Sequence, residues 1–286
     1  MTVRDILHES TKALEAVGIP SARLDAEILL SFCLGFDRMD FYKNPAMAIS
    51  ETQLAVYREL LARRLQWEPV AYLICRKDFW SFALEVNSSV LIPRPDTEII
   101  VEEALDICNN FTSLDMRILD IGTGSGAIAL ALASEIEGVK VVATDISAPA
   151  LALAQKNASA LGLKERIDFR QGNLFEPVDG LFDIIVSNPP YIAASDYKEL
   201  PASVKAFEPR EALLAGISGL EFYEKLIYSA PAYLKKNGWL LLEIGAKQEA
   251  GVRGILEAVD CYESIEMRRD YAGLPRVIRS RRKASG

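Results

Sequence analysis

The chain has little of the chemistry that metal centres and histidine-based catalysis need. It contains one histidine, His8, which is too few for a histidine-based zinc site and argues against a histidine-dependent catalytic triad. Cysteine is also scarce and shows no CxxC spacing, because the four residues lie far apart: Cys33, Cys75, Cys108 and Cys261. This usage is typical of reduced thiols. We therefore expect no metal site and a cytoplasmic protein.

Long apolar runs and excess positive charge are missing as well. No run reaches the length of a membrane span, and Thr2-Val3-Arg4-Asp5 leads into an amphipathic segment rather than a signal peptide. The net charge of −8 argues against a broad phosphate-binding surface, since nucleic-acid affinity depends on Lys and Arg. We expect neither a membrane nor a nucleic-acid substrate. A chain of 286 residues allows one large or two modest domains.

Residues 1–75 show apolar side chains at helical spacing. A first stripe closes at Gly18 and Pro20, and a later helix has Ser50 as its expected N-cap. Short helices joined by short loops predict a small bundle. Because this segment carries no catalytic constellation, we interpret it as a helical substrate-recognition bundle.

Residues 76–95 are interpreted as a hairpin and a proline-rich joint. Residues 78–87 are aromatic and alternate in polarity, which predicts a hairpin. A Pro-Arg-Pro sequence then keeps the chain extended, and Asp96 or Thr97 is expected to cap a helix that begins near Glu98.

The most informative motif is Asn188-Pro189-Pro190-Tyr191. It follows the continuous apolar run 182–187, which predicts a buried strand of a parallel sheet. The prolines end the strand and hold Asn188 extended at its carboxyl end, where ligands bind in open α/β sheets. An amide and an aromatic ring presented there suit the binding of a planar amino group.

A cofactor-binding pattern precedes this motif. The strand 116–121 is followed by a glycine-rich loop and the apolar helix 127–133. The G-x-G-x-G spacing differs from the G-x-G-x-x-G of dinucleotide sites. A second strand ends at Asp145, an acid that fits the ribose of NAD as well as that of S-adenosylmethionine. The loop residues are Gly122, Thr123, Gly124, Ser125 and Gly126.

The remaining pattern completes a doubly wound α/β sheet over residues 96–286. A strand over 167–170 leads to Asn173 and Leu174, where an adenine ring could be bracketed. Residues 192–218 lack regular pattern and predict an ordered lid on the substrate side. Two closing strands near 262–268 and 277–279 could form an antiparallel hairpin at one sheet edge.

With these motifs the chain resembles, over nearly its full length, the protein-(glutamine-N5) methyltransferases that modify class I peptide chain release factors. Asn-Pro-Pro-Tyr alone also fits methyltransferases of nucleic-acid amino groups such as N6 of adenine, whereas the helical bundle and the joint narrow the match. The residues that carry it are Ile92-Pro93-Arg94-Pro95-Asp96-Thr97-Glu98, Asp120-Ile121 with the loop Gly122–Gly126, Asn188–Tyr191, Phe207-Glu208-Pro209, Arg269-Asp270-Tyr271 and Arg276-Val277.

The resemblance implies a Rossmann-like methyltransferase domain that binds S-adenosylmethionine. It implies that Gly122–Gly126 holds the cofactor, that Asp145 binds its ribose, and that Leu174 lies beside its adenine, where the strand end also offers Asn173 as an amide partner. Asn188 would face both methionine and substrate. The substrate implied is the glutamine of a Gly-Gly-Gln loop.

That glutamine would enter against Asn188, Pro189, Pro190 and Tyr191. The methyl-transfer roles fall to Asn188, Pro189 and Tyr191. Partners would be class I release factors, with a ribosomal-protein glutamine as an alternative substrate, and we expect a monomer. The sequence departs from the family pattern at Cys75, usually glycine, and at Asn173, usually an acid.

Overall fold

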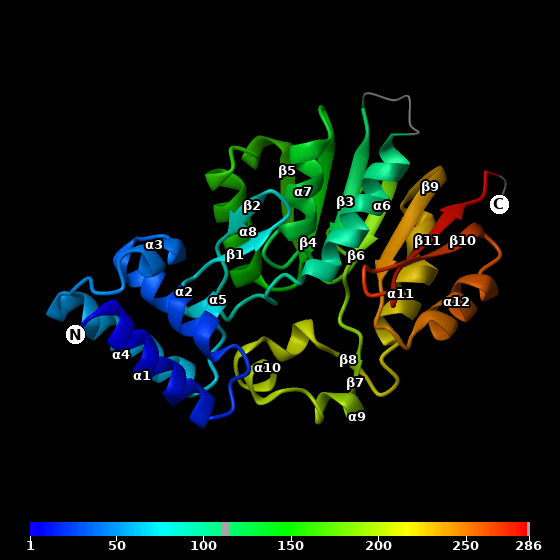
Figure 1. Ribbon diagram of the computed structural model, residues 1–286. Helices are drawn as coiled ribbons and strands as arrows, with labels where there is room; N and C mark the ends of the chain where they lie inside the picture. Colours follow the sequence, from blue (N-terminus) through cyan, green and yellow to red (C-terminus); the bar gives the residue numbers. More distant parts are fainter. Residues whose placement is uncertain (110–114, 285–286) are drawn as a thin grey trace. The chain divides into compact units, whose positions relative to one another are not determined.

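The computed structural model describes residues 1–109 and 115–284. The chain divides into two units, and one segment from the second half of the sequence belongs to the first unit. The helical unit contains residues 1–76 and 201–207, and the α/β unit contains residues 77–200 and 208–286. Figure 1 colours both along the chain.

The helical unit begins at a capping box and buries one continuous apolar core. Thr2 caps the first helix and Ser50, as predicted, caps the fourth, each with its reciprocal side-chain bond. Leu7, Leu14 and Leu30 are among its fully buried core residues. The helices are α1 Val3–Ala16, α2 Ala22–Leu34, α3 Arg38–Lys43, α4 Glu51–Leu65, α5 Val70–Leu73 and α10 Ala202–Phe207.

Cys75 lies at the end of this unit with a φ of 51°. This is the left-handed region, which glycine enters without steric cost and other residues rarely adopt. The cysteine therefore keeps a backbone conformation that suits the glycine expected there from the family pattern.

The α/β unit opens with the predicted hairpin, formed by β1 Lys77–Phe79 and β2 Phe82–Leu84. The joint continues into the 3₁₀ turn η1 Pro95–Thr97 and then α6 Glu98–Cys108. The expected capping of α6 by Thr97 or Asp96 is wrong. Thr97 makes no side-chain cap, because its hydroxyl accepts a hydrogen bond from Asn188, and the Asp96 carboxylate pairs with Arg276 at 3.1 Å.

Seven strands form the central sheet, in the order β10-β11-β9-β6-β3-β4-β5. The five strands from β9 to β5 are parallel neighbours, and β10 and β11 join antiparallel at one edge, as predicted for the closing hairpin. The strands are β3 Arg117–Ile121, β4 Lys140–Asp145, β5 Ile167–Gln171, β6 Phe182–Ser187, β9 Leu234–Glu243, β10 Tyr262–Arg269 and β11 Pro275–Arg282.

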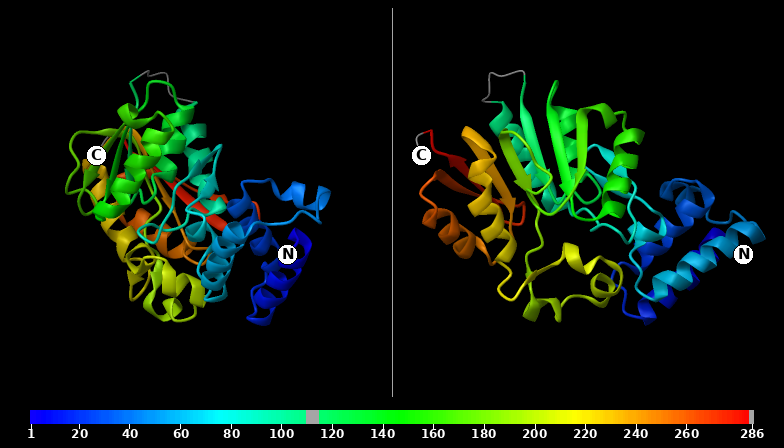
Figure 2. Two further views of the ribbon diagram at one scale, coloured as in Figure 1. Left: turned by 90° about the vertical axis from the view of Figure 1, so that its left-hand side faces the viewer. Right: turned by 180° about the vertical axis from the view of Figure 1, so that it is seen from behind.

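Helices cover both faces of the sheet, as a doubly wound fold requires. Helices α11 and α12 pack on one face, and Figure 2 shows α12 beside the β10–β11 edge that it contacts. The other face carries α6, which contacts β6, β9, β10 and β11. The helices and turns of this unit not yet given are α7 Ala127–Glu135, α8 Ala148–Ala160, η2 Lys164–Arg166, α9 Ala194–Tyr197, η3 Arg210–Ala212, α11 Glu221–Ser229, η4 Ala230–Ala232 and α12 Glu249–Ala258.

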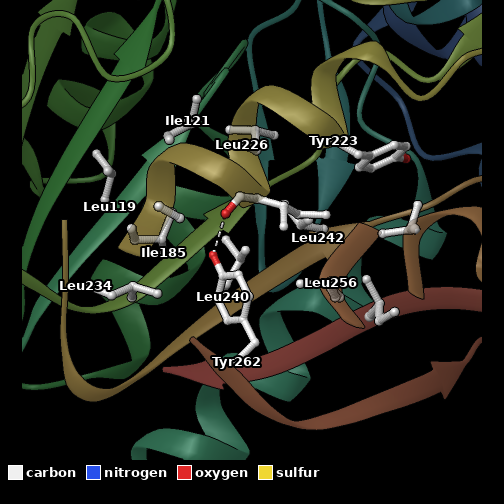
Figure 3. Close-up of a cluster of buried hydrophobic side chains, with 14 of the residues drawn as sticks. Leu119, Ile121, Ile185, Tyr223, Leu226, Leu234, Leu240, Leu242, Leu256 and Tyr262 are labelled. Atoms are coloured by element: carbon white, nitrogen blue, oxygen red, sulfur yellow. Dashed lines mark hydrogen bonds between the residues drawn. The ribbon is translucent and has the colours of Figure 1, made fainter. Parts of the chain in front are cut away.

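Alternation along the strands builds the core beneath α11 and α12. Leu119, Ile185 and Leu240 point from three neighbouring strands into one cluster with helix residues such as Leu226 (Figure 3). The buried hydroxyl of Tyr262 has a hydrogen-bond partner within the cluster, because it donates to the Ile227 carbonyl oxygen at 2.8 Å. This packing fixes the register of the strands that carry the site.

The segment predicted as an ordered lid does contain regular structure. Its strands β7 Ile192–Ala193 and β8 Leu214–Gly216 pair in parallel, and both belong to the α/β unit. Within the part of the chain that the structure describes, no helix is long and apolar enough to cross a membrane.

Candidate active site

The site lies where the chain reverses its direction of travel across the sheet. From β3 the chain proceeds outward to β4 and β5, then returns to place β6 on the other side of β3. Such a switch point leaves a crevice at the carboxyl ends of the two strands. Here Ile121 and Ser187 are paired in register, and the Ser187 hydroxyl donates to the Ile121 carbonyl oxygen at 2.7 Å. The glycine loop and Asn188 therefore leave the sheet side by side.

The glycine loop is held against β4 by its own backbone. The N–H groups of Gly122 and Thr123 both donate to the Thr144 carbonyl oxygen, at 2.8 and 2.9 Å. All three glycines of the loop have positive φ, from 56° at Gly124 to 87° at Gly126. A Cβ at Gly122 or Gly124 would meet no described atom within 4 Å, so open space lies beside both.

Asp145 ends β4, and each of its oxygens accepts a backbone N–H, one from the glycine loop and one from the N-cap residue of α8. Oδ2 accepts the Gly124 N–H and Oδ1 accepts the Ser147 N–H, each at 2.9 Å. A carboxylate oxygen has more than one lone pair, so both can accept a further hydrogen bond. The carboxylate therefore positions the loop and can still accept hydrogen bonds from the two hydroxyls of a diol.

Asp120 lies beneath the loop and was not among the predicted cofactor residues. It is fully buried in β3, and its Oδ2 accepts the Thr123 hydroxyl at 2.6 Å. Its Oδ1 has no hydrogen-bond partner among the described residues. Burial raises the pKa of this carboxyl to about 7, against the opposing effect of the Thr123 hydrogen bond.

Asn188 is held by a residue from the joint. Its Nδ2 donates to the Thr97 hydroxyl at 3.2 Å. Next to both lies Glu243, the last residue of β9, which is 1% exposed. Burial raises the pKa of Glu243 to about 7, while hydrogen bonding by Thr97 and Asn188 and the charge of Arg276 act in the other direction. The sequence analysis missed Glu243, although an acid that closes an apolar strand is the same signal that singled out Asp145.

Tyr191 does not line the cavity at this crevice. Its ring is half-buried against the hydrophobic cluster, and its carbonyl oxygen accepts the Gln248 side-chain amide at 2.9 Å. Burial and the nearby Glu243 charge raise the pKa of the Tyr191 hydroxyl to about 12, so the ring stays neutral. Its stacking on a substrate amide stays a prediction.

Asn173 and Leu174 both line the cavity beyond β5. Leu174 has a φ of 50°. The Asn173 backbone N–H donates to Glu176 at 3.3 Å, and its side-chain Nδ2 lies 3.5 Å from the other Glu176 oxygen. An acid at position 173 would meet a like charge there, so the asparagine that departs from the family pattern is matched by its neighbour.

The cavity has a volume of about 660 Å³, within the range of small-molecule sites. Asn188, Pro189 and Pro190 form one wall and the five loop residues 122–126 contribute all but Gly126 to the other. Arg94 also lines the cavity and pairs with Glu208 at 2.5 Å. This ion pair connects the motif of residues 92–98 with the Phe-Glu-Pro motif of residues 207–209. Among the described residues no cluster of side chains suited to a metal ion occurs.

Comparisons with known proteins agree with this geometry. A family model described as "PrmC N-terminal domain" matches residues 5–74, and one described as "Methyltransferase small domain" matches residues 103–205. A release factor glutamine methyltransferase from Geobacter sulfurreducens is 41% identical over 98% of this chain and 96% of its own length. The chain belongs to the release factor glutamine methyltransferase family.

The match to other members of this family also covers nearly the full length of both chains. The Vibrio cholerae release factor glutamine methyltransferase is 42% identical over 97% of this chain and 96% of its own. Among solved structures, a methyltransferase from Pyrococcus furiosus superposes with a TM-score of 0.52 at 22% identity, over 78% of this chain and 96% of that one. That likeness bears on the fold alone, and the predicted Rossmann-like methyltransferase fold is confirmed.

Proposed function

We propose that this protein transfers a methyl group from S-adenosylmethionine to the side-chain amide nitrogen of the glutamine in the Gly-Gly-Gln loop of class I release factors. The observation that carries the proposal is the pairing of Ile121 with Ser187, which brings the glycine loop and Asn188 to one crevice. The full-length likeness to proteins named for this activity supports the substrate.

The residues present fit S-adenosylmethionine. The cavity is large enough, the open space at Gly122 and Gly124 allows close approach of a ligand, and Asp145 has lone pairs left for the ribose hydroxyls. We assign Gly122–Gly126 and Asp145 to the cofactor, with Asn173 and Leu174 beside the adenine. When bound, the cofactor supplies a methyl carbon activated by the positive sulfur.

The protein's own part is to orient the amide that is methylated. A carboxamide nitrogen is a poor nucleophile because its lone pair is delocalised into the carbonyl. If the Asn188 Oδ1 and the Pro189 carbonyl oxygen accept its two N–H bonds, the lone pair turns toward the methyl donor. The same acceptors stabilise the positive charge that develops on nitrogen, and the loss of one N–H proton to water then gives the neutral N-methyl amide.

The helical unit is proposed to recognise the substrate protein, and residues 76–95 to join it to a methyltransferase domain spanning residues 96–286. Apolar side chains exposed on α2, on α3 and in the turn between them support this role: Phe32, Phe36, Met39 and Tyr42. The net charge of −8 favours a protein over a nucleic acid as partner. The monomeric state stays a prediction.

The test is to incubate the protein with S-adenosylmethionine and an unmodified release factor, then map the Gly-Gly-Gln peptide by mass spectrometry. We expect one added methyl on that glutamine. Asn188→Ala should reduce the rate more than tenfold with cofactor affinity retained, whereas the exposed Asn109→Ala serves as a matched control with wild-type rate. An unmodified peptide, with cofactor bound, would contradict the substrate and turn the search to ribosomal-protein glutamines and nucleic-acid amino groups.

A further inference from the structure

A buried carboxylate stands directly behind the amide of Asn188. Leu242 of β9 is paired in register with Ser187 of β6, so the next residues along the two strands, Glu243 and Asn188, leave the sheet together. The backbone of Glu243 is fixed in turn, because its carbonyl oxygen accepts the Tyr223 hydroxyl at 2.9 Å. A charge at 1% exposure on this edge needs a reason beyond packing.

The direction of the hydrogen bonds supplies that reason. Thr97 lies close enough to Glu243 to lower the pKa of its carboxyl, and because an ionised carboxylate can only accept, the hydrogen of the Thr97 hydroxyl is the only one that Thr97 can offer it. Thr97 can then only accept from Asn188, as the 3.2 Å contact from Nδ2 shows. The Asn188 group that faces Glu243 must be the NH₂ for the same reason. Both neighbours therefore select one of the two orientations of the amide.

We propose that Glu243, together with Thr97, is a positioning residue that locks the Asn188 amide with its oxygen toward the substrate nitrogen. The proposal rests on the proposed function and deepens it. With the amide reversed, Asn188 would present N–H donors to a substrate N–H group, and the acceptor on which the reaction depends would be lost.

The lock depends on the charge of Glu243. The charged and titratable groups that face its carboxyl are Arg276 from β11, Asp96 from η1, Tyr191 after β6 and Tyr223 from α11. Burial outweighs the cation and places the pKa of Glu243 at about 7. Its Oε2 has no hydrogen-bond partner among the described residues and offers a place for a proton.

A protonated Glu243 can donate to the Asn188 oxygen, which stabilises the reversed amide. The rate constant kcat should therefore fall on the acid side of a midpoint near pH 7, since only the ionised form enforces the productive orientation. Cofactor affinity should have the same pH dependence in the wild type and in Glu243→Gln, because Glu243 is not among the residues that line the cavity and Asp120 beneath the loop is unchanged.

The experiment compares the wild-type protein with Glu243→Gln, Thr97→Val and a control, Glu103→Gln. Glu103 is another buried glutamate beside arginines, 3.0 Å from Arg279, and it does not line the cavity. We expect kcat on the release factor to fall about 10- to 100-fold in the first two variants. The S-adenosylmethionine affinity of Glu243→Gln should stay within about twofold of the wild-type value by calorimetry, because Glu243 does not line the cavity. The acid limb of the wild-type profile should be absent from Glu243→Gln and present in Glu103→Gln.

A second measurement keeps this test separate from the substrate assignment. The side-chain amide of Asn188, assigned by NMR through its loss in Asn188→Ala, should titrate with a midpoint near pH 7 in the wild type and not in Glu243→Gln. Failure of the wild type to modify the release factor would count against the proposed function only. A wild-type kcat in Glu243→Gln, an acid limb that persists there, or an Asn188 amide insensitive to pH would each overturn the positioning role.

Discussion

Replacement of Asp120 by asparagine should stabilise the protein at alkaline pH. The carboxyl is 0% exposed, and burial raises its pKa from 3.8 to about 7. A folded-state pKa above the unfolded value means that the stabilising contribution is complete below pH 3.8 and is lost as pH rises through 7. Asparagine of the same shape can still accept the Thr123 hydroxyl and carries no charge to desolvate.

The magnitude follows from the pKa change. At about 1.36 kcal/mol for each pH unit, the full effect is about 4 kcal/mol, of which about 2–3 kcal/mol falls between pH 5 and pH 8.5. We therefore expect the free energy of unfolding of Asp120→Asn, relative to the wild type, to increase by about 1–3 kcal/mol across this interval. The expected value is smaller than the full pKa-derived change because the protein relaxes around the buried carboxylate. Urea unfolding at both pH values measures it.

The matched control is Asp183, a buried aspartate on the neighbouring strand β6 whose carboxylate has both a cation and a backbone N–H as partners. Its Oδ2 accepts the Arg117 backbone N–H and the Lys235 ammonium, both at 2.8 Å. Asp183→Asn should lower the free energy of unfolding at both pH values, by about 1–3 kcal/mol, since it removes a charge that has partners. The reasoning about Asp120 is refuted if its asparagine variant gains no stability between pH 5 and pH 8.5.

Three further outcomes follow from the site. Asp145→Ala should weaken S-adenosylmethionine binding about 10- to 150-fold by calorimetry, since charge-assisted hydrogen bonds are lost, and an unchanged Kd would exclude the ribose role. Glu208→Gln should lower the free energy of unfolding by about 1.5–3 kcal/mol in urea, because its 1%-exposed carboxylate pairs with Arg94; equal stability would mean that the pair contributes nothing. Gly126→Ala places an alanine at a φ of 87° and its Cβ 3.0 Å from the Leu130 side chain. It should lower the free energy of unfolding by about 1–3 kcal/mol, measured by thermal unfolding. Gly254→Ala, in α12 with open space around it, should instead be neutral or stabilising.

The sequence was sufficient to predict the edge of the sheet where the site lies. Each of β3, β4 and β6 ends in a marked change from apolar to polar or turn-forming residues, at Gly122, Asp145 and Asn188. Because parallel neighbours bring their carboxyl ends to one edge, these positions had to lie near each other. The glycine spacing and the two prolines fixed the ends of the elements without any knowledge of the packing.

The partners of those residues could not be predicted in the same way. Thr97 and Asn188 are 91 positions apart, so nothing local distinguishes a hydroxyl that accepts from Asn188 from one that caps α6. Glu243 looks like any acid at a strand end until the register of β6 and β9 places it beside Asn188. The contact of Asn173 with Glu176 is different, because the two residues are only three positions apart and the pair was open to local reasoning.

The membership of residues 201–207 in the helical unit has a consequence for how the protein is made. The chain passes from one unit to the other at positions 76, 200 and 207, so the helical unit is started first and is completed only when residue 207 has been made. On the ribosome it lacks α10 until most of the central sheet has been synthesised, whereas domains usually fold in the order in which they emerge. A truncation at residue 76 would keep the whole apolar core of the helical unit, which lies within residues 3–74, and would lack only α10, which buries none of its residues.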